Sequence, residues 1–456
     1  DLSVTEFLSR KEVESISKWM LDEALRGGAS GADVLYSEGA GSGLSLKDGE
    51  IEECVTGFTA GIGVRTIMSD GRQGISYGNR LDKLSLHELV EWSLFNCRNS
   101  EPEEGIMLYE GKLVSDPSLD LEDPEITAIT PQKRMELCRV MTESAMAADS
   151  SILSVRSASW HDGWGSSFYC TSTGLEGWER GSSANCGVSV IASDGKNTEM
   201  GGHGEESRRL DELDIRKIAL KAVDKTVSAL GGTPVKTGPY TIVIEPETAA
   251  SLVDVIGDLF CAPEIHKGRS LMAERLNSKV ASSCVTLVDD GRIPWKAGTG
   301  SWDAEGVPTG RTLLIKDGIA CSYLYNLQYA WKDGVASTGN ACRGMSSLPD
   351  VGTSNLLLQA GSETPLSLIS GVGCGLYLTE LMGLHTIDPI SGDFSVGAKG
   401  QLIENGKITK PVSGVTIASN LMDFLNSIVA VGSDLTFFGS TAAPTLVVEN
   451  IVVAGE

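Results

Sequence analysis

Residues able to perform acid–base or metal chemistry are few in this chain, and histidine is the scarcest. The five histidines among 456 residues are His87, His161, His203, His266 and His385. His87-Glu88 begins like the zinc motif H-E-x-x-H, but residue 91 is glutamate, so a helix there would offer one imidazole where two are needed. A polar helix face is the better interpretation of this segment.

A second metal arrangement could be built from carboxylates. Asp254 and Asp258 are four residues apart, hence on one face of a predicted helix, and Glu264 and His266 follow closely. A site made of Asp254, Asp258 and His266 would give a self-sufficient metal hydrolase. The alternative is a solvated helix face, because nothing in the spacing brings the two pairs to ligand distance.

A nucleophilic mechanism has one candidate. Cys374 lies among glycines in the segment 371–375, where a substrate backbone could approach, and His385 could serve as its base if the fold brought the two together. An inert cysteine in a glycine-rich strand is the competing interpretation. The chain has no G-x-x-x-x-G-K-[ST] phosphate loop, which excludes the common nucleotide-triphosphatase signature.

Hydrophobic periodicity predicts the elements of the first half. Apolar residues at helical spacing predict helices over 13–24, 86–97, 131–146 and 213–230. Between the first two helices the period changes to two, which predicts a meander of hairpins over 31–77 that turns at Asp48-Gly49 and Asp70-Gly71. Short strands are expected over 151–206. An acidic, proline-containing stretch at 100–130 is typical of a solvated linker.

The composition of the sequence changes after the linker-like segment 233–239. A strand over 240–244 and a helix over 246–260 are followed by glycine-rich sequence with hairpin signals at Asp290-Gly291, Asp317-Gly318 and Asn405-Gly406. We therefore predict an α+β protein, with an N-terminal α/β domain of helices and antiparallel hairpins and a C-terminal Gly-rich, predominantly antiparallel β domain. The predicted division is 1–99 (α+β subdomain), 100–130 (acidic linker), 131–235 (second α+β subdomain) and 236–456 (β-rich core domain).

Composition excludes several classes of function. The chain has 37 basic and 61 acidic residues, a net charge of −24, which disfavours nucleic acids and anionic membranes as partners. Its 10 cysteines are scattered with no C-x-x-C pair, which is typical of reduced cytosolic thiols and not of a zinc ribbon. No run of about 18 uncharged apolar residues occurs, and the N-terminus is acidic and amphipathic, so we expect a cytoplasmic protein.

Motifs of the C-terminal half carry a family resemblance. The segments 288–294, 303–309, 314–318 and 337–340 with Arg343 resemble the shared core of the TldD/PmbA family, metallopeptidase-related proteins also called modulators of DNA gyrase. The segments 378–383, 391–394, 404–408, 411–412 and 416–418 are similar to the PmbA (TldE) branch in particular. The resemblance is strong over 240–456 and loose before it.

The resemblance also shows a departure from the zinc-binding branch. In the TldD branch this domain's first helix carries H-E-x-x-x-H, and a cysteine near the C-terminus completes the site. The corresponding helix here, 251–260, has no histidine, and the tail 434–444 has no cysteine. A zinc site needs three protein ligands, so we expect no zinc or other cofactor in this chain and zinc in a TldD-type partner.

The leading hypothesis is thus a PmbA/TldE-like subunit of a cytoplasmic TldD/TldE-type peptidase that degrades or processes small or unfolded peptides. The resemblance implies a heterodimer with the zinc subunit and a homodimer when the chain is alone. The apolar runs 366–370 and 445–448 are expected to leave strand edges that a dimer would cover. Residues expected at a substrate groove or interface are Asp303, Glu305, Thr338, Asn340 and Arg343, with turn and loop stabilisation as the alternative.

Two other hypotheses remain open. One is the self-sufficient metal or cysteine hydrolase described above. The other is a binding protein that acts on a toxin, an antitoxin or a gyrase subunit without proteolysis.

Overall fold

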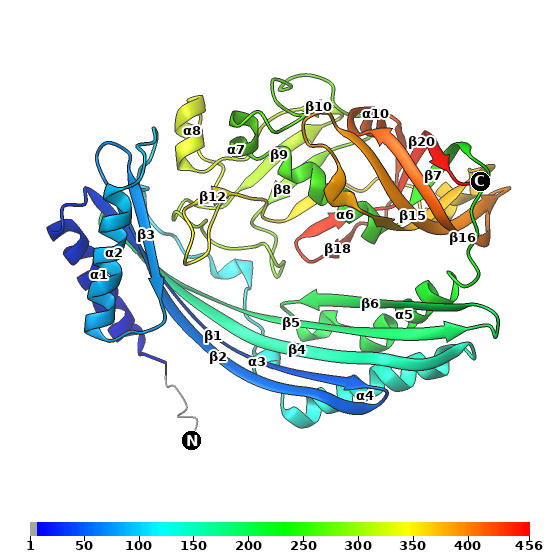
Figure 1. Cartoon of the computed structure of the whole chain (residues 1–456), viewed down its shortest axis with the longest axis horizontal. Coiled ribbons are helices and arrows are strands. Elements are labelled where there is room, and N and C mark those ends of the chain that lie inside the picture. Colours follow the sequence, from blue (N-terminus) through cyan, green and yellow to red (C-terminus); the bar gives the residue numbers. More distant parts are fainter. Residues whose placement is uncertain (1–6) are drawn as a thin grey trace.

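The first half of the chain is built on one antiparallel sheet. A computed structural model describes residues 7–456. Six strands lie in the order β3-β2-β1-β4-β5-β6, and the sheet curves beneath the C-terminal half (Figure 1). Their bounds are β1 (Gly31–Lys47), β2 (Glu50–Ile67), β3 (Gln73–Gly78), β4 (Ile152–Thr171), β5 (Glu176–Ser193) and β6 (Thr198–Ser207). Because β1 pairs with β4 over 33–46, the segments 1–99 and 131–235 share this sheet.

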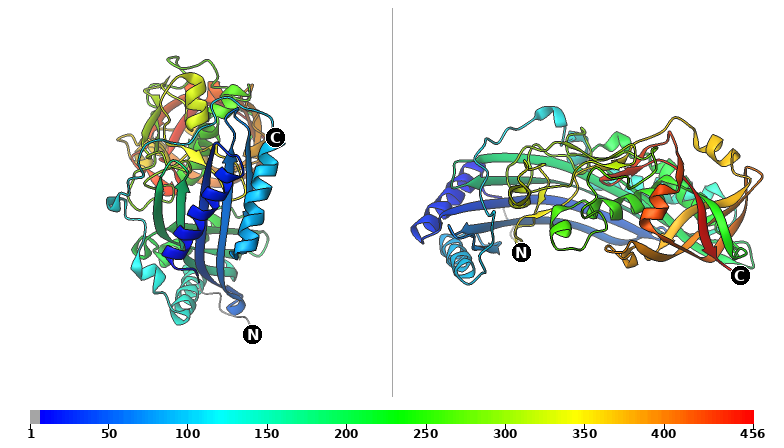
Figure 2. Two further views of the ribbon diagram at one scale, coloured as in Figure 1. Left: turned by 90° about the vertical axis from the view of Figure 1, so that its left-hand side faces the viewer. Right: turned by 90° about the horizontal axis from the view of Figure 1, so that it is seen from above.

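Helices cover the convex face of the sheet. The long ones are α1 (Arg10–Arg26), α2 (Lys83–Arg98), α4 (Pro131–Ala148) and α5 (Ile215–Val227), and a short α3 (Pro124–Thr127) precedes α4. Each long helix begins after a residue whose side-chain oxygen accepts a backbone N–H of the first turn, as Thr130 does from Lys133. The predicted helices are therefore confirmed. α1 and α2 lie together at one end of the sheet, and α4 and α5 at the other (Figures 1 and 2).

The two faces of the sheet differ in side-chain content. On β1 the even-numbered side chains Val34, Tyr36 and Leu44 are buried beneath the helices. Glycine recurs at odd-numbered positions of the concave face: Gly39, Gly41 and Gly43 on β1, Gly57, Gly61 and Gly63 on β2, and Gly163 and Gly165 on β4. Large side chains are therefore scarce on this face, and a hollow of about 670 Å³ lies along it.

The C-terminal half contains two further six-stranded sheets. The first has the order β10-β9-β8-β13-β19-β18, and the second has the order β16-β15-β14-β7-β20-β17. The first sheet is formed by β8 (Leu287–Asp290), β9 (Arg311–Lys316), β10 (Ile319–Ala320), β13 (Leu356–Leu358), β18 (Thr436–Phe438) and β19 (Thr441–Ala443). The second is formed by β7 (Gly238–Ile244), β14 (Cys374–Met382), β15 (Asp393–Glu404), β16 (Lys407–Asn420), β17 (Ile428–Val431) and β20 (Leu446–Ala454). Most pairings are antiparallel, which confirms the predicted β-rich domain.

The second sheet closes on itself and helix α6 packs against both sheets. β16 pairs with β20 as well as β15, so five strands form a ring. Helix α6 (Pro246–Asp258) contacts β13, β18 and β19 of the first sheet and β14 of the second. Gly257 permits this approach, because a Cβ there would lie 2.4 Å from Leu356 Cδ2. Other short elements are α7 (Ala262–His266), α8 (Leu327–Asp333), β11 (Ala341–Cys342), β12 (Asp350–Val351), α9 (Pro365–Ser370) and α10 (Leu421–Asn426).

Some local predictions are confirmed and others are wrong. The strands expected to be short over 151–206 are long, with 20 residues in β4 and 18 in β5. The turns at Asp48-Gly49, Asp317-Gly318 and Asn405-Gly406 all have positive φ at both residues, as the hairpin signal requires. Asp290-Gly291 is not a tight hairpin, because β8 ends at Asp290 and β9 begins only at Arg311. The run 366–370 belongs to helix α9, and 445–448 leads into β20, which pairs on both sides, so neither is a free strand edge.

The acidic segment between α2 and α3 lies against the C-terminal half. Asp116 pairs with Arg292, and its N–H donates to Ser301 Oγ at 3.0 Å. Gln328 Nε2 donates to Glu103 Oε2 at 2.7 Å. Contacts to the C-terminal domain therefore occur at both ends of this segment. Across residues 7–456 none of the helices has the length and apolar character needed to cross a membrane.

Candidate functional site

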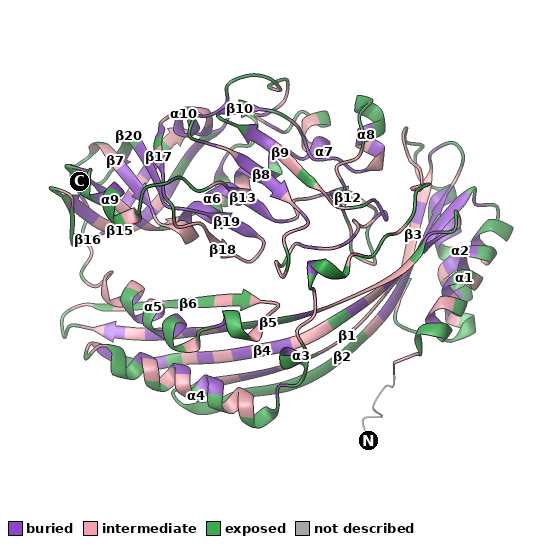
Figure 3. Cartoon of the chain, turned by 180° about the vertical axis from the view of Figure 1, so that it is seen from behind, coloured by how far each residue is buried: buried purple, intermediate pink, exposed green. Residues whose placement is uncertain are grey.

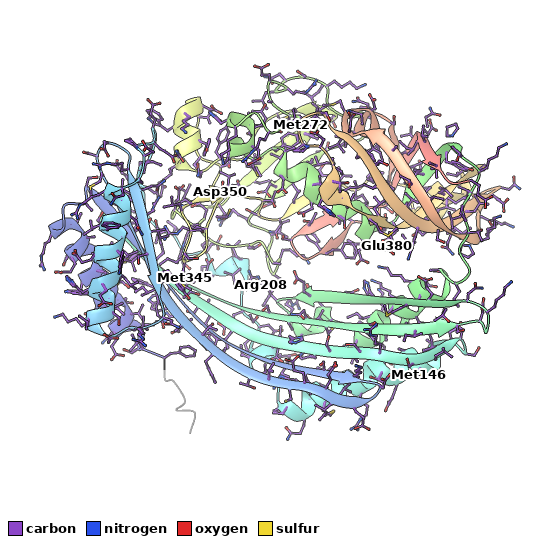
Figure 4. The ribbon with its side chains drawn as sticks, in the orientation of Figure 1. Met146, Arg208, Met272, Met345, Asp350 and Glu380 are labelled. Carbon is purple, nitrogen blue, oxygen red and sulfur yellow. The ribbon has the colours of Figure 1, made fainter. Side chains whose placement is uncertain are left out.

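A cleft runs between strand β6 and the underside of the C-terminal domain. Three neighbouring cavities of about 270, 280 and 650 Å³ make it up, and Glu247 of α6 lines all three. Together they extend along β6 from Glu199 to Glu206. Arg208, which follows β6, and Glu380 on β14 lie on the two sides of the gap in Figure 4. Arg208 donates to the carbonyl oxygens of Lys296 and Ala297 and so ties the end of β6 to the C-terminal domain.

β6 is an edge strand, and its outer edge faces this cleft. The N–H of Asp194 donates to Asn197 O at 3.2 Å and closes the β5–β6 hairpin. Ladder bonds alternate along an antiparallel pair, so every second residue of β6 turns its backbone N–H and C=O away from β5. These residues are Thr198, Met200, Gly202, Gly204 and Glu206, and all five are exposed. No hydrogen bond joins their backbone groups to any other part of the described chain.

The opposite wall offers a second strand edge. β18 is the last strand of its sheet, and residues 435–439 line the 650 Å³ cavity together with Gly204 and Glu206. Phe438 pairs with Thr441 across a two-residue turn, so the backbone groups of Phe437 point away from β19. Lys296 Nζ lies 4.7 Å from the centre of the Phe437 ring. Two unpaired strand edges therefore face one cavity.

Charged side chains cross the cleft beside β6. His203 Nε2 lies 3.0 Å from Glu205 Oε1, and its Nδ1 lies 3.4 Å from Glu247 Oε2. Lys225 pairs with Glu247, and Lys221 Nζ lies 2.9 Å from Glu205 Oε1. These contacts join the N-terminal sheet and α5 to the first turn of α6.

The pKa shifts in this cluster follow from burial and pairing. Burial opposes protonation of His203, but hydrogen bonds to Glu205 and Glu247 raise its pKa overall. The hydrogen bond from His203 is the main cause that lowers the pKa of Glu205 to about 2. Burial would raise the pKa of Glu247, yet His203 and Lys225 lower it to about 2. Both glutamates are therefore ionised at neutral pH.

The carboxylates considered as metal ligands are not gathered into one site. Asp254 Oδ1 accepts from Thr441 Oγ1 at 3.2 Å, whereas His266 Nε2 lies 2.7 Å from Asp333 Oδ1. Burial and the nearby charge of Asp254 raise the pKa of Asp258. Within residues 7–456 no group of three or more His, Cys, Asp and Glu side chains is arranged to hold a metal ion. Helix α6 and the segment 434–444 contain neither histidine nor cysteine. The donor atoms that they offer therefore do not fit a zinc site.

The cysteine alternative fails on geometry. Cys374 is the first residue of β14 and His385 lies just beyond the end of that strand. An extended strand rises about 3.3 Å per residue, so the nine residues of β14 hold the two side chains far apart. Cys374 is exposed, and the residue opposite it in the β14–β15 pairing is Glu404.

Four of the five residues expected at a groove or interface are engaged in loop structure. Asp303 accepts backbone N–H groups of Glu305, Val307 and Ala341. Glu305 Oε2 accepts from Leu327 N at 2.9 Å. Thr338 Oγ1 accepts from Tyr325 N, and Asn340 Nδ2 donates to Asp289 Oδ2 at 2.7 Å. Burial and the charge of Glu305 raise the pKa of Asp303 to about 7. A substrate-binding role for these residues stays a prediction.

Arg343 instead joins the two halves of the chain. Its Nη1 donates to Asp33 Oδ1 at 2.8 Å, and Asp33 Oδ2 also accepts from Arg65 Nη2 at 2.6 Å and from Tyr169 at 3.2 Å. The side chains of Asp33 and Arg343 are fully buried, and Arg65 nearly so. Burial opposes ionisation of Asp33, but Arg343 and Arg65 hold the pKa of its carboxyl below the usual value. Met345 lies at the same junction (Figure 4), and its carbonyl oxygen packs over Gly63.

Sequence reasoning did not identify the β6 cleft. The one local signal for it is the group Gly201, Gly202 and Gly204, since glycine inside a strand often marks a place where another backbone approaches. The partners that complete the cleft, on α6, β14 and β18, lie at least 40 residues farther along the chain.

Comparison with known proteins gives one consistent family. Models of the PmbA/TldA metallopeptidase domain 1, central domain and C-terminal domain match residues 32–97, 124–230 and 237–455. The chain is 26% identical to the metalloprotease PmbA of Escherichia coli O157:H7, over 95% of this chain and 94% of that protein. A Bacteroides thetaiotaomicron structure described as a proposed modulator of DNA gyrase superposes with a TM-score of 0.88, 26% identity and coverage of 99% and 100%. TldE from Thermococcus kodakarensis shares the fold, with a TM-score of 0.87, 22% identity and coverage of 97% and 100%.

Proposed function

This chain belongs to the PmbA/TldD metallopeptidase family, and on that premise we propose that it is a PmbA/TldE-like subunit that works with a TldD-type zinc subunit on small or unfolded peptides. The pair would act in the cytoplasm. Catalysis would belong to the zinc subunit, because this chain lacks the histidines of α6 and the cysteine of the tail that the zinc branch carries. This chain's own part would be to hold peptide.

The free edge of β6 in the cleft carries this proposal. An extended peptide could add to β6 through the backbone groups of Met200, Gly202 and Gly204, which have no partner in the described chain. Such main-chain pairing gives affinity with little sequence preference, which suits unfolded peptides as a class. The edge of β18 on the opposite wall could pair with the other side of the same peptide.

The binding step can be tested with one substitution and a matched control. Met200→Pro removes an outward-facing N–H without breaking the ladder to β5, whereas Met200→Ala keeps that N–H and removes only the side chain. Fluorescence anisotropy with a labelled unfolded peptide should show weaker binding for Met200→Pro and near-normal binding for Met200→Ala. Equal affinities of the two variants would contradict binding by strand addition.

The assignment of peptide binding to this chain and of catalysis to the zinc subunit needs a second experiment. Peptide cleavage and metal content should be measured for this chain, for a TldD-type subunit and for their mixture. Cleavage that rises on mixing with no added metal in this chain supports the proposal. Cleavage by this chain alone favours the self-sufficient hydrolase, and peptide binding with no cleavage in the mixture favours the non-proteolytic binding protein.

A further inference from the structure

A peptide added to the edge of β6 would place alternate side chains into different cavities. Successive side chains of a strand point to opposite faces of the sheet, and residues directly opposite one another share a face. The pairing runs from Gly43 of the concave face through β4 and β5 to Glu206, so Glu206 and Gly204 lie on the concave side, in the 650 Å³ cavity. His203 lies on the other side, in the 280 Å³ cavity. Figure 3 shows β6 along the border of the N-terminal sheet, with exposed residues on it and β18 across the gap.

The cavity on the concave side has room for a long side chain. Gly204 has no side chain, and neither has Gly187, its partner on β5, so a peptide residue opposite Gly204 meets open space. Leu435, Phe437 and Phe438 add apolar surface to the opposite wall. Such a wall suits a side chain with an apolar stem and a polar head.

One carboxylate of this cavity has no partner. Four glutamates line the cavity, and three of them are in ion pairs, Glu205 with Lys221, Glu247 with Lys225 and Glu212 with Lys296. The fourth, Glu206, is exposed and makes neither an ion pair nor a side-chain hydrogen bond within residues 7–456. Arg208, two residues on, donates to backbone carbonyl oxygens instead. The Glu206 carboxylate reaches the opposite wall, since a Cβ on Gly439 would lie 2.8 Å from its Oε1.

We propose that Glu206 makes this cleft selective for peptides that carry a lysine or an arginine opposite Gly204. The inference rests on the proposed peptide binding at β6 and adds the chemical class of the peptide. Diagonal neighbours on paired strands lie about 7–8 Å apart, within reach of a long side chain, so the cationic head can meet the Glu206 carboxylate. The net charge of −24 also attracts basic peptides. Lys221 and Lys225 line the cavity on the other face, so that face offers a basic side chain no equivalent site.

Peptide affinity tests the selectivity. Three labelled unfolded peptides, otherwise uncharged, would differ only in one central residue, which is lysine, glutamine or glutamate. At physiological salt, which screens distant charges, the wild type should bind the lysine peptide about two- to fivefold more tightly than the glutamine peptide, and the glutamate peptide least. Glu206→Gln should remove the preference for lysine over glutamine, and Glu206→Lys should reverse it. Glu143→Lys makes the same charge change at an exposed position of α4 and should keep the wild-type order.

Disulfide trapping tests where the basic residue lies. If the lysine is opposite Gly204, the peptide residue four positions away, before or after it according to the strand direction, is opposite Met200 on the same face. A cysteine at that position should cross-link to Met200→Cys under mild oxidation. A cysteine three positions away faces the other side and should not cross-link. Replacing the lysine by glutamine should lower the yield, and the wild-type chain gives the background from native cysteines.

The results separate this inference from the proposed function. Equal affinities for the three peptides, with binding still weakened by Met200→Pro, would overturn the selectivity and leave strand addition at β6 intact. A preference for lysine that survives Glu206→Gln, or that Glu143→Lys removes as well, would overturn the role of Glu206. Cross-linking that is as efficient at three positions as at four would overturn the placement opposite Gly204. Absence of any peptide binding would overturn both the selectivity and the proposed function.

Discussion

Removing the charge of Asp33 should destabilise the protein more than any surface substitution. Asp33 accepts hydrogen bonds from Arg65, Arg343 and Tyr169 in a site closed to water. Asp33→Asn keeps the shape of the side chain but leaves two buried guanidinium groups without their carboxylate. Breaking a buried ion pair by removing one partner costs about 3–5 kcal/mol, and here one carboxylate serves two arginines.

Urea unfolding followed by tryptophan fluorescence measures this cost. We expect Asp33→Asn to lower the free energy of unfolding of the N-terminal sheet by about 3–5 kcal/mol. Glu52→Gln, which removes an exposed ion pair with Lys47 at 3.7 Å, should cost less than about 1 kcal/mol. Hydrogen exchange should also become faster in residues 341–349, because Arg343 anchors that loop to β1.

A double-mutant cycle and the pH dependence of stability give two independent tests of the role of Asp33. Arg343→Met combined with Asp33→Asn should cost less than the sum of the single changes, because the two side chains share one interaction. Because the pKa of Asp33 is lowered by folding, its stabilising effect is complete at neutral pH and is lost only as the pH falls below the usual carboxyl range. The wild type should therefore exceed Asp33→Asn in stability by a constant amount from pH 8 to pH 5. A cost for Asp33→Asn no larger than that of Glu52→Gln would refute the reasoning.

Three other predictions concern metal, nucleic acid and pH. Metal analysis of the purified chain should find no stoichiometric zinc, and a bound zinc lost on Asp254→Ala would contradict this. Gel-shift assays at physiological salt should detect no duplex DNA complex, since the chain carries a net charge of −24; a complex that survives such salt would mean a basic face had been overlooked. Because the pKa of Asp303 is raised to about 7, its contribution to stability is complete below the unfolded pKa of about 4 and is lost as the pH rises through 7. The unfolding free energy of the wild type should thus fall relative to Asp303→Asn between pH 5 and pH 8, by at most about 1.4 kcal/mol per pH unit, and a difference that stays constant would argue against a buried, titrating Asp303.

Local sequence determined most of the elements. Helix α4 follows from the Thr130 cap, the Pro131 at its first position and the spacing of Leu137, Cys138 and Met141. The turn at Asp48-Gly49 follows from two residues that tolerate positive φ. The family followed from motifs in the C-terminal half, and the family models match that half as one domain.

Predictions from local sequence were wrong where the same residues are compatible with two different structures. The run 366–370 is short and apolar, a pattern that a strand and a helix share, and the Thr364 cap with Pro365 decides for helix α9. Asp290-Gly291 has the composition of a hairpin turn, but the chain leaves the sheet there for a long loop and returns at Arg311. Such choices depend on what packs against the segment.

The sites were decided by tertiary structure. Asp33 and Arg343 are 310 residues apart in the sequence. Strand β4, which pairs with β1 beside Asp33, is also distant from β1 along the chain, so only folding brings them together. The β6 cleft combines one edge strand with α6, β14 and β18, and nothing in residues 198–207 alone shows that this edge stays unpaired. The physical reason is the sequence separation over which each interaction acts. Caps, turns and hydrophobic periodicity involve residues a few positions apart, so the sequence reveals them directly. Strand pairing and buried ion pairs join residues far apart in the chain, and only the closed fold determines which of them meet.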